Sequence, residues 1–450
     1  MSDSKVLTRF APSPTGNLHI GNARSALLNW IFAKKNNGNF ILRIDDTDKE
    51  RSKDEFIQSI KKNLNFLGIQ WSKSFKQSEN YSIYNKQISK LKNLKKLYPC
   101  FETQEELNLK RKSLLSSGKA PIYDRSSLEL KSNQIQDLIS QGKKPHWRFY
   151  LENKKIIWND LIRGHTEFES IKLSDPILIR EDGTLLYHLP SVIDDISESI
   201  TDIIRGEDHV TNTAFHIQIF EALGSKPPNF GHHPLLLDNF GKNLGKRMGS
   251  LSINEILKEG YEPLTITNYL SKIGSSQNVT SEIDISKIIS SFNISDFSRS
   301  SPKFDKKDLT NINKNIIKKF DYDNVEKKLY NLGIINKNIE FWNLVKNNIS
   351  FIHESIDWWK IITEKKIFYN EQKEFLLDCA SVLPNESFTI NTWNKWLENI
   401  KKISNKKGSE LFIPLRLALT GKEKGPELKY LIPLLSRELI LYRLGAKNDS

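Results

Sequence analysis

The order of secondary structure predicted for the first 45 residues constrains the fold most. Val6 to Ala11 is a short apolar-rich run that ends at Pro12, and Phe40 to Asp45 is a second such run. Between them, from Ile20 to Lys35, apolar residues recur at helical spacing, and Gly38 lies just beyond. A strand, a helix and a strand within about 40 residues form a βαβ unit. The sequence therefore predicts an α/β fold with a parallel sheet and a right-handed crossover.

The loop PSPTGNLHIGN follows the first predicted strand and contains two prolines and two glycines, which exclude regular structure throughout it. Ligands bind at the carboxyl ends of strands in open sheets of this kind, which is where this loop falls. His19 lies at the start of the predicted helix, where free N–H groups favour phosphate and an imidazole can donate to a phosphoryl oxygen. The small residues Pro14, Gly16 and Gly21 allow a nucleotide to approach the backbone. The alternative is a His19 that only packs or caps the helix.

A second loop, GKNLGKRMGS, places Lys246 and Arg247 between glycines. A mobile lysine in a glycine-rich loop suits a step in which negative charge appears and the product must then leave. The alternative is a solvated turn. Ser252 and Glu255 form a capping box that predicts the start of a helix directly after this loop.

The rest of the chain divides into an insertion and a helical region. Residues 100–175 resemble an insertion, with a helical stretch from Gln104 to Leu115 and the alternating strand HWRFYL. The segments DPILIR and TLLYHLPSV predict a hairpin around Glu181-Asp182-Gly183. The segment IIRGEDH ends a further strand, and Thr211 to Leu223 is an amphipathic helix. Beyond Tyr261 the pattern is mostly helical.

Composition restricts the class of protein without identifying it. The formal charge of +13 fits a polyanionic partner, and it equally fits a Lys- and Asn-rich composition imposed by an AT-rich genome. No apolar run approaches the roughly 18 residues that span a bilayer, and the N-terminus lacks the layout of a signal peptide. Cys100 and Cys379 cannot form a disulfide framework. We therefore expect a cytoplasmic protein with no membrane association.

Taken together, the motifs resemble one known family. APSPTGNLHIGNAR followed by LGKRMGSLS resembles the paired HIGH and KMSKS signatures of class I aminoacyl-tRNA synthetases. The segments RFAPSPTG, LRIDDTD, YHLPSVIDD, IIRGEDH and LFIPLRLALTG resemble the glutamyl branch of that class, bacterial type, in family order over nearly the full chain. The resemblance implies ATP-dependent attachment of glutamate to tRNA in two steps. It also implies a Rossmann-type catalytic domain (1–100 and 186–255), an inserted tRNA acceptor-binding domain (101–185), a stem-contact helical domain (256–320) and an all-α anticodon-binding domain (321–450).

The resemblance also assigns roles to matching positions. The residues implied in ATP binding are Ser13, Pro14, Gly16, His19, Gly21 and Lys246, and those implied in catalysis are His19, Lys246 and Arg247. The residues implied in glutamate binding are Arg9, Asp45, Tyr187, Ser191 and Arg205. Arg9 and Arg205 would bind the two carboxylates of the substrate, because a guanidinium pairs with a carboxylate through two parallel bonds. Asp45 would face the substrate ammonium, while Tyr187 and Ser191 would line the pocket. Without the resemblance, an ordinary surface ion pair is the favoured interpretation of each of these residues.

Partners follow from the same resemblance. They are L-glutamate, ATP with Mg²⁺ sharing the charge of the triphosphate, and tRNA(Glu), tRNA(Gln) or both. A monomer is the family expectation. Some bacterial relatives bind zinc in the insertion through a Cys/His cluster, but Cys100 has no second cysteine nearby and Tyr123 to Ser127 offers neither Cys nor His. Because a structural zinc site needs four ligands, no zinc is expected.

Two segments depart from the family pattern. The glutamyl segment usually contains IEDTD, whereas Asp45 stands here in place of glutamate, which retracts the carboxylate by roughly 1.5 Å. In the KMSKS-like loop, Asn243 occupies the first position and Gly245 the third, so either Lys242 substitutes or Lys246 and Arg247 carry the function.

These departures keep alternatives open. One is an enzyme that glutamylates mainly tRNA(Gln) ahead of amidation, and another is a catalytically retired tRNA-binding protein. A glutaminyl-tRNA synthetase is disfavoured because its anticodon region is β-rich, whereas this one is helical in pattern. A small-molecule adenylyltransferase is disfavoured because it would not need the long helical C-terminal region.

Overall fold

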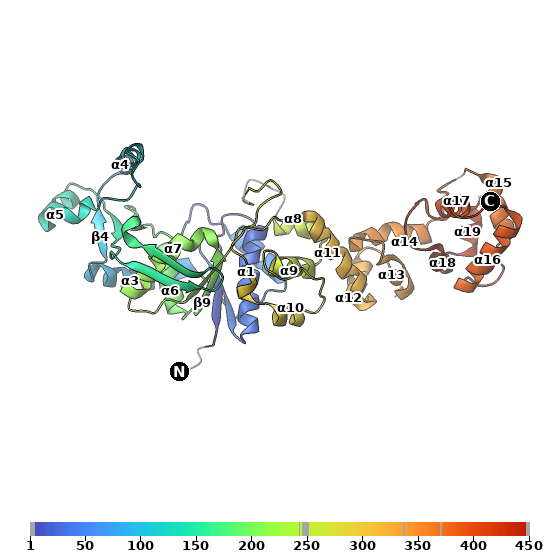
Figure 1. The fold of residues 1–450 in the computed structure, drawn as a ribbon, viewed down its shortest axis with the longest axis horizontal. Coiled ribbons are helices and arrows are strands. Elements are labelled where there is room, and N and C mark those ends of the chain that lie inside the picture. Colours follow the sequence, from blue (N-terminus) through green and yellow to red (C-terminus); the bar gives the residue numbers. More distant parts are fainter. Residues whose placement is uncertain (1–4, 243, 245–251, 336–337, 370, 447–450) are drawn as a thin grey trace. The chain divides into compact units, whose positions relative to one another are not determined.

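The computed structural model describes residues 5–242, 244, 252–335, 338–369 and 371–446. The chain forms two compact units, the first made of residues 1–259 and 266–306 and the second of residues 260–265 and 307–450 (Figure 1). The division near residue 306 falls inside the segment 256–320 for which a separate helical domain is expected from the sequence. Each unit is described by itself.

The first unit is built on an all-parallel sheet, which confirms the predicted fold class. Its strands, in spatial order, are β10 (Asn229–His233), β9 (Asp202–Gly206), β1 (Leu7–Phe10), β2 (Asn39–Ile44) and β3 (Lys73–Lys76). Helix α1 (Ile20–Lys35) packs against β1, β2 and β9 and connects β1 to β2 as predicted. Its apolar residues Leu27 and Ile31 are fully buried. After the helix, a side chain at Gly38 would collide with the backbone of Val6, so only glycine fits there.

The strand order places a crevice at the carboxyl edge of the sheet. β1 lies between β2, which follows it through α1, and β9, which comes much later in the chain. The connection after β1 therefore leads to one side of the sheet, to β2, whereas the connection after β9 leads to the other side, to β10. Open α/β sheets bind ligands at such a point. The other helices of this unit are α2 (Asp54–Phe66), α3 (Tyr81–Asn93), α6 (His188–Ser197), α7 (Val210–Ala222), α8 (Ile253–Lys258), α9 (Pro263–Lys272, within this unit from Ile266) and α10 (Ile285–Ser291).

The insertion consists of two small antiparallel sheets and two helices. One sheet pairs β4 (Leu97–Cys100), β5 (His146–Phe149) and β8 (Ile177–Ile179), and the other is the hairpin of β6 (Lys155–Asp160) and β7 (Gly164–Glu169). The helices are α4 (Gln104–Ser116) and α5 (Ser132–Ser140). The first of these strands begins at Leu97, four residues before the expected boundary at residue 101, because LYPC carries no turn signal that would mark the boundary.

The predicted hairpin of DPILIR and TLLYHLPSV is wrong in its second half. Only an isolated bridge joins Ile179 to Leu185, and the chain then enters helix α6 at His188. Pro190 lies in the first turn of that helix, where a missing backbone N–H breaks no helical bond. A short apolar run around a proline does not distinguish a buried strand from the start of a buried helix.

The second unit is helical throughout its described residues, which confirms the predicted character of the C-terminal region. Its helices are α11 (Lys306–Lys319), α12 (Tyr322–Asn331), α13 (Ile339–Val345), α14 (Ser355–Thr363), α15 (Lys373–Ser381), α16 (Ile390–Ile403), α17 (Ser409–Thr420), α18 (Leu428–Leu431) and α19 (Arg437–Arg443). Trp342, Trp358 and Trp396 belong to its buried core. Among the helices of the described residues, none has the length and apolar character that crossing a bilayer requires.

Candidate active site

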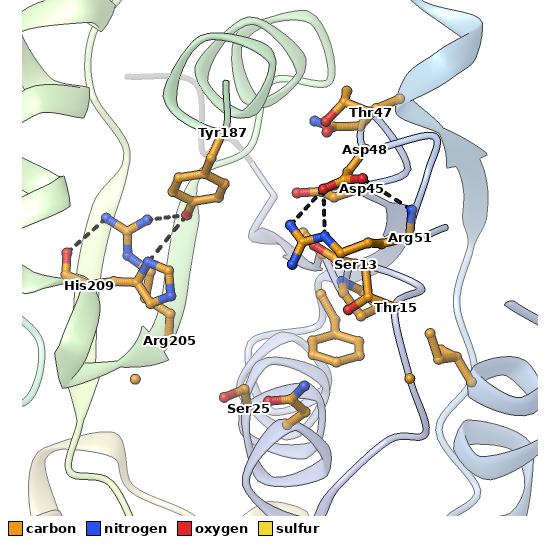
Figure 2. A pocket seen from close by; sticks show the side chains of 18 of the residues that line it. Ser13, Thr15, Ser25, Asp45, Thr47, Asp48, Arg51, Tyr187, Arg205 and His209 are labelled. Atoms are coloured by element: carbon orange, nitrogen blue, oxygen red, sulfur yellow. Dashed lines mark hydrogen bonds and ion pairs between the residues drawn. The ribbon is translucent and has the colours of Figure 1, made fainter. Parts of the chain in front are cut away.

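A cavity of about 1160 Å³ opens at the carboxyl edge of the parallel sheet. This volume exceeds the range of roughly 300 to 1,000 Å³ that a single small ligand usually occupies. Its lining comes from the ends of four strands, and includes Arg9 and Phe10 at the end of β1, Asp45 directly after β2, Arg205 and Gly206 at the end of β9, and His233 at the end of β10. Figure 2 shows Tyr187, Arg205 and His209 on one wall and Asp45, Asp48 and Arg51 on the facing wall. The cavity has room for two ligands side by side.

His19 both caps helix α1 and lines the cavity. Its Nδ1 accepts hydrogen bonds from the backbone N–H groups of Gly21 (3.1 Å) and Asn22 (3.4 Å). An acceptor at Nδ1 requires that the proton of the neutral imidazole sits on Nε2. His19 therefore caps the helix, which is the alternative prediction, and it also lies at the helix N-terminus beside the cavity.

The structure requires a small residue at some positions of the first loop and not at others. A Cβ at Gly21 would stand 3.0 Å from Cε1 of His19 and would displace the imidazole. A Cβ at Gly16 would meet no protein atom within 4 Å, so protein packing does not require glycine there. Ser13 and Gly16 line the cavity, whereas Pro14 is buried behind its wall and accepts a bond from the Lys53 N–H (3.1 Å).

The second loop comes close to the first at both of its described ends. Leu244 lines the cavity, and Ser252 forms an antiparallel bridge with His19. Ser252 and Glu255 form the predicted capping box. Lys246 and Arg247, together with Asn243 and Gly245, lie outside the described residues. The backbone of Lys242 is held in a turn by bonds to Asp238 (both 2.8 Å).

A buried network of charges forms the floor under Asp45. Arg43 donates to both oxygens of Asp45 (2.7 and 3.2 Å) and to Oδ1 of Asp195 (2.8 Å). Arg9 donates to both oxygens of Asp195 (3.1 and 3.2 Å). Asp194 lies 3.9 Å from Nε of Arg43. All five side chains are more than nine-tenths buried, so each charge depends on its partners for stabilisation.

This network changes the picture of Arg9 that the sequence suggests. The Nε and Nη2 edge of its guanidinium is paired with Asp195, so its Nη1 group is the part that a ligand in the cavity could contact. Ser191 is not among the residues that line the cavity, and its role in glutamate binding stays a prediction. It is fully buried, and its hydroxyl accepts a bond from Nη2 of Arg43 (2.9 Å).

Arg205 is a buried cation without an acidic partner. Its N–H groups donate to His232 Nε2 (3.3 Å), to the Tyr187 hydroxyl (3.1 Å), and to Thr213 Oγ1 (2.6 Å) and the His209 carbonyl (3.5 Å). No carboxylate of the described residues forms an ion pair with it, although it is 6% exposed. Burial is the main reason that its pKa is lowered from the ordinary value. One Nη1–H is left for a ligand in the cavity.

The histidines around Arg205 stay neutral at pH 7. Burial, followed by the charge of Arg205, lowers the pKa of His188 and of His209 to about 4. Burial likewise lowers the pKa of His216, which lies 3.1 Å from His188 between ring nitrogens. Arg205 is therefore the positive charge that a ligand meets on this wall of the cavity.

Comparison with known proteins agrees with this geometry. Residues 5–311 match the family model for the catalytic domain of class I tRNA synthetases (E and Q), and residues 298–447 match an anticodon-binding domain. A glutamate–tRNA ligase of Hyphomonas neptunium is 43% identical over 98% of this chain and 99% of its own. A glutamate–tRNA ligase of Rickettsia bellii is 45% identical over 98% of this chain and 100% of its own. The chain belongs to the glutamyl-tRNA synthetase family.

The fold agrees with a solved member of the glutamyl-tRNA synthetase family. The crystal structure of a glutamate tRNA ligase from Elizabethkingia meningosepticum, in complex with its amino acid, superimposes with a TM-score of 0.86. The two chains are 25% identical, and the match covers 98% of this chain and 99% of the other.

Several residues of the site in this chain could not be predicted from the sequence. Arg43, Asp194 and Asp195 stand inside segments that carry the family resemblance, yet nothing local marks them as a network. A signal did exist for Arg43, because a charged residue in the middle of the apolar run FILRI needs a buried partner. His232 carries no such signal.

The insertion of this family member contains one group of potential metal ligands. Single atoms of Cys100, Glu102 and His146 lie within 4.8 Å of one another. This set is one ligand short of a structural zinc site. The Glu102 carboxylate also already accepts bonds from the hydroxyls of Tyr123 (2.7 Å) and Ser127 (2.9 Å). These residues do not fit zinc, and the absence of zinc stays a prediction.

Proposed function

We propose that the protein attaches glutamate to tRNA at the expense of ATP, and that the cavity is where glutamate is activated. The observation that carries the proposal is Arg205, a buried guanidinium without an acidic partner among the described residues, facing the cavity that His19 also lines. Burying such a charge costs free energy unless a ligand anion pairs with it. A dicarboxylic amino acid supplies that anion.

The facing walls suit the three charges of glutamate. Arg205 and the Tyr187 hydroxyl would take one carboxylate, and the free edge of Arg9 would take the other. Asp45, on the opposite wall, would face the ammonium group. The neutral amide of glutamine would leave Arg205 without a counter-charge, so the proposal includes discrimination against glutamine.

The first loop suits ATP. The backbone from Ser13 to Gly16 with Gly21 would hold the nucleotide, and His19 would donate from Nε2 to a phosphoryl oxygen at the helix N-terminus. Lys246 and Arg247 would bind the triphosphate. Mg²⁺ prefers phosphate oxygens and water as ligands, so it would arrive with ATP and share its charge.

The chemistry then needs no covalent nucleophile from the protein. The α-carboxylate of glutamate attacks the α-phosphorus of ATP, which gives glutamyl-adenylate and releases pyrophosphate. A hydroxyl of the terminal ribose of tRNA attacks the activated carbonyl, which gives glutamyl-tRNA and releases AMP. Positioning and electrostatic stabilisation are what the side chains supply.

The remaining parts of the chain would bind tRNA. We propose that residues 101–185 hold the acceptor end, that residues 256–320 contact the stem, and that residues 321–450 bind the anticodon. The charge of +13 suits a polyanionic partner of this size. A monomer is sufficient for this arrangement.

Aminoacylation with each purified tRNA tests the proposal. We expect glutamyl-tRNA to form with ATP, glutamate and tRNA(Glu), tRNA(Gln) or both. Charging of tRNA(Gln) alone would identify the variant that precedes amidation. Absence of product with either tRNA would contradict the proposal and favour a catalytically retired tRNA-binding protein.

Glutamate binding should weaken as the pH falls through about 6. Burial raises the pKa of Asp45 to about 6 against the opposing charges of Arg43 and Arg9. Only the ionised carboxylate attracts the ammonium group, so the dissociation constant should rise by up to about tenfold per pH unit below that value. Calorimetry between pH 5 and 8 measures it, in a window above the pKa of about 4 of His188 and His209.

The matched control for this pH dependence is Asp45→Asn, which should bind weakly with no dependence in that window. A dependence that persists in Asp45→Asn would contradict the assignment. The contribution of Asp45 to the stability of the fold depends on pH in the opposite direction. The folded-state pKa lies above the usual value of 3.8, so the stabilising contribution of Asp45 is complete below pH 3.8 and is lost as the pH rises through 6.

Lys246→Ala should lose far more activity than Lys242→Ala. A charged hydrogen bond is worth about 1.5 to 3 kcal/mol, which corresponds to roughly ten- to a hundredfold in kcat/KM. The backbone of Lys242 is fixed in a turn by Asp238, and Lys242 does not line the cavity. Steady-state kinetics of the two variants measure the difference, and equal losses would mean that Lys242 shares the function.

A further inference from the structure

Asp160 and His232 form a buried pair directly behind Arg205. Asp160 ends strand β6 of the inserted hairpin, and His232 lies on strand β10 of the parallel sheet. Oδ2 of Asp160 lies 2.5 Å from Nδ1 of His232, and both side chains are completely buried. The two residues are 72 positions apart in the chain, and neither lines the cavity.

Asp160 fixes which nitrogen of His232 carries the proton. Its Oδ1 accepts the backbone N–H groups of Ile162, Arg163 and His232 (3.0 to 3.1 Å), and its Oδ2 also accepts Nε1–H of Trp158 (3.2 Å). Burial opposes ionisation of Asp160, but the bond and charge of His232 together with the backbone N–H groups outweigh it and lower the pKa of Asp160. A carboxylate that only accepts requires the proton on Nδ1, which leaves Nε2 as an acceptor.

Nε2 of His232 faces the guanidinium of Arg205. It lies 3.3 Å from Nε of Arg205 and 2.9 Å from the Thr213 hydroxyl. The same hydroxyl accepts a bond from Nη2 of Arg205 (2.6 Å). The Nε and Nη2 edge of Arg205 is thus held by His232 and Thr213, and the Nη1 side is the one left for the cavity.

We propose that Asp160 and His232 are positioning residues that aim Arg205 at the side-chain carboxylate of the substrate. The inference rests on the proposed function, and it adds that the Asp160–His232 pair sets the affinity for glutamate. If the proton sat on Nε2, two N–H groups would face each other and Arg205 would turn away. A displacement of about 1 Å at a bound group can cost on the order of 10²-fold.

The pair also joins the insertion to the amino-acid pocket. Besides the Asp160 contacts, the N–H of Leu161 donates to the carbonyl of Phe230 (2.8 Å). The turn after β6 is therefore attached to β10, and the direction of Arg205 depends on how the hairpin is seated. A merely structural Asp160–His232 pair would hold the hairpin without affecting glutamate.

Two substitutions of His232 separate these roles. The amide of asparagine reaches as far as Nδ1 of histidine and retains the contact to Asp160, but it does not reach Arg205. The amide of glutamine reaches as far as Nε2 and retains the acceptor for Arg205, but it loses Asp160. We expect His232→Asn to raise KM for glutamate by about tenfold to a hundredfold and to leave KM for ATP within about twofold. His232→Gln should stay within about threefold of wild type for glutamate.

The thermal midpoints should follow the opposite order. His232→Gln leaves the buried carboxylate of Asp160 without its ring partner and should unfold at the lower temperature, whereas His232→Asn should unfold nearer to wild type. A purely structural role predicts that KM for glutamate follows the loss of stability. An unchanged KM in His232→Asn, or the larger KM in His232→Gln, would overturn the inference.

Asp160→Asn provides an independent test should either His232 variant fail to fold. Its remaining oxygen still accepts the three backbone N–H groups, while its amide donates to Nδ1 and moves the proton of His232 to Nε2. We expect KM for glutamate to rise by about tenfold or more at an unchanged KM for ATP, and an unchanged KM for glutamate would overturn the inference. Charging by the wild-type enzyme is measured alongside, because its absence would refute the proposed function rather than this inference.

Discussion

Replacing Arg205 with methionine is expected to abolish the use of glutamate without lowering the stability of the protein. The substitution leaves a buried substrate carboxylate without its counter-charge, which costs about 3 to 5 kcal/mol and corresponds to a fall of roughly 10²- to 10⁴-fold in kcat/KM. The folded protein, by contrast, loses a charge whose pKa burial lowers and which has no acidic partner among the described residues. Methionine has a similar length and no charge to desolvate.

Steady-state kinetics and thermal unfolding of the same preparation test this expectation. Arg205→Lys is the matched control, because it keeps the charge but loses the planar guanidinium. Its activity should lie between those of the wild type and Arg205→Met. A binding site whose charge is held ready for a ligand gains stability when that charge is removed. An Arg205→Met protein that unfolds several degrees lower and still uses glutamate normally would contradict the assignment.

Arg43→Met is expected to have the opposite effect on stability. Arg43 pairs with Asp45 and Asp195 and lies near Asp194, all of them buried. Its removal leaves these carboxylates with Arg9 as their remaining cation in the network, and breaking a buried ion pair in this way costs about 3 to 5 kcal/mol. The midpoint of thermal unfolding should therefore fall by about 5 to 10 °C. Glutamate binding should fail as well, because Asp45 loses the group that orients it.

The two variants are best measured side by side. Both replace a buried arginine with the same residue in the same unit, and they differ in whether acidic partners surround the arginine. Differential scanning calorimetry gives the midpoints under one buffer condition. If Arg43→Met unfolds no earlier than Arg205→Met, the charge network under Asp45 does not stabilise the fold in the way its geometry indicates.

The fold could be predicted where local signals agree. The helix from Ile20 to Lys35 has the predicted bounds because its apolar spacing and its glycine exit mark both ends. The capping box at Ser252 and Glu255 fixes the start of α8 in the same way. The segment from Thr184 to Val192 is predicted as a strand from its sequence, but an apolar run with one proline fits a helix equally well. Packing of the segment against α3 and α7, which the sequence does not display, decides in favour of the helix.

The candidate site could be predicted only in part. The strand ends and the motif loops identify Arg9, His19 and Arg205, and the cavity is lined by all three. The partners of these residues could not be predicted, since Arg43 and Asp195 are 152 positions apart and no pattern in the sequence pairs them. The motif alone predicts Ser191 in the pocket, and no sequence pattern indicates that its hydroxyl accepts a bond from Arg43.

ATP–pyrophosphate exchange with glutamate and with glutamine, each in the presence of tRNA(Glu) or tRNA(Gln), tests the central claim most directly. The buried charge of Arg205 predicts exchange with glutamate when a suitable tRNA is present, and exchange with glutamine at least about a hundredfold slower. Equal exchange with the two amino acids would contradict the role of Arg205. No exchange with glutamate in the presence of either tRNA would contradict the proposed function itself.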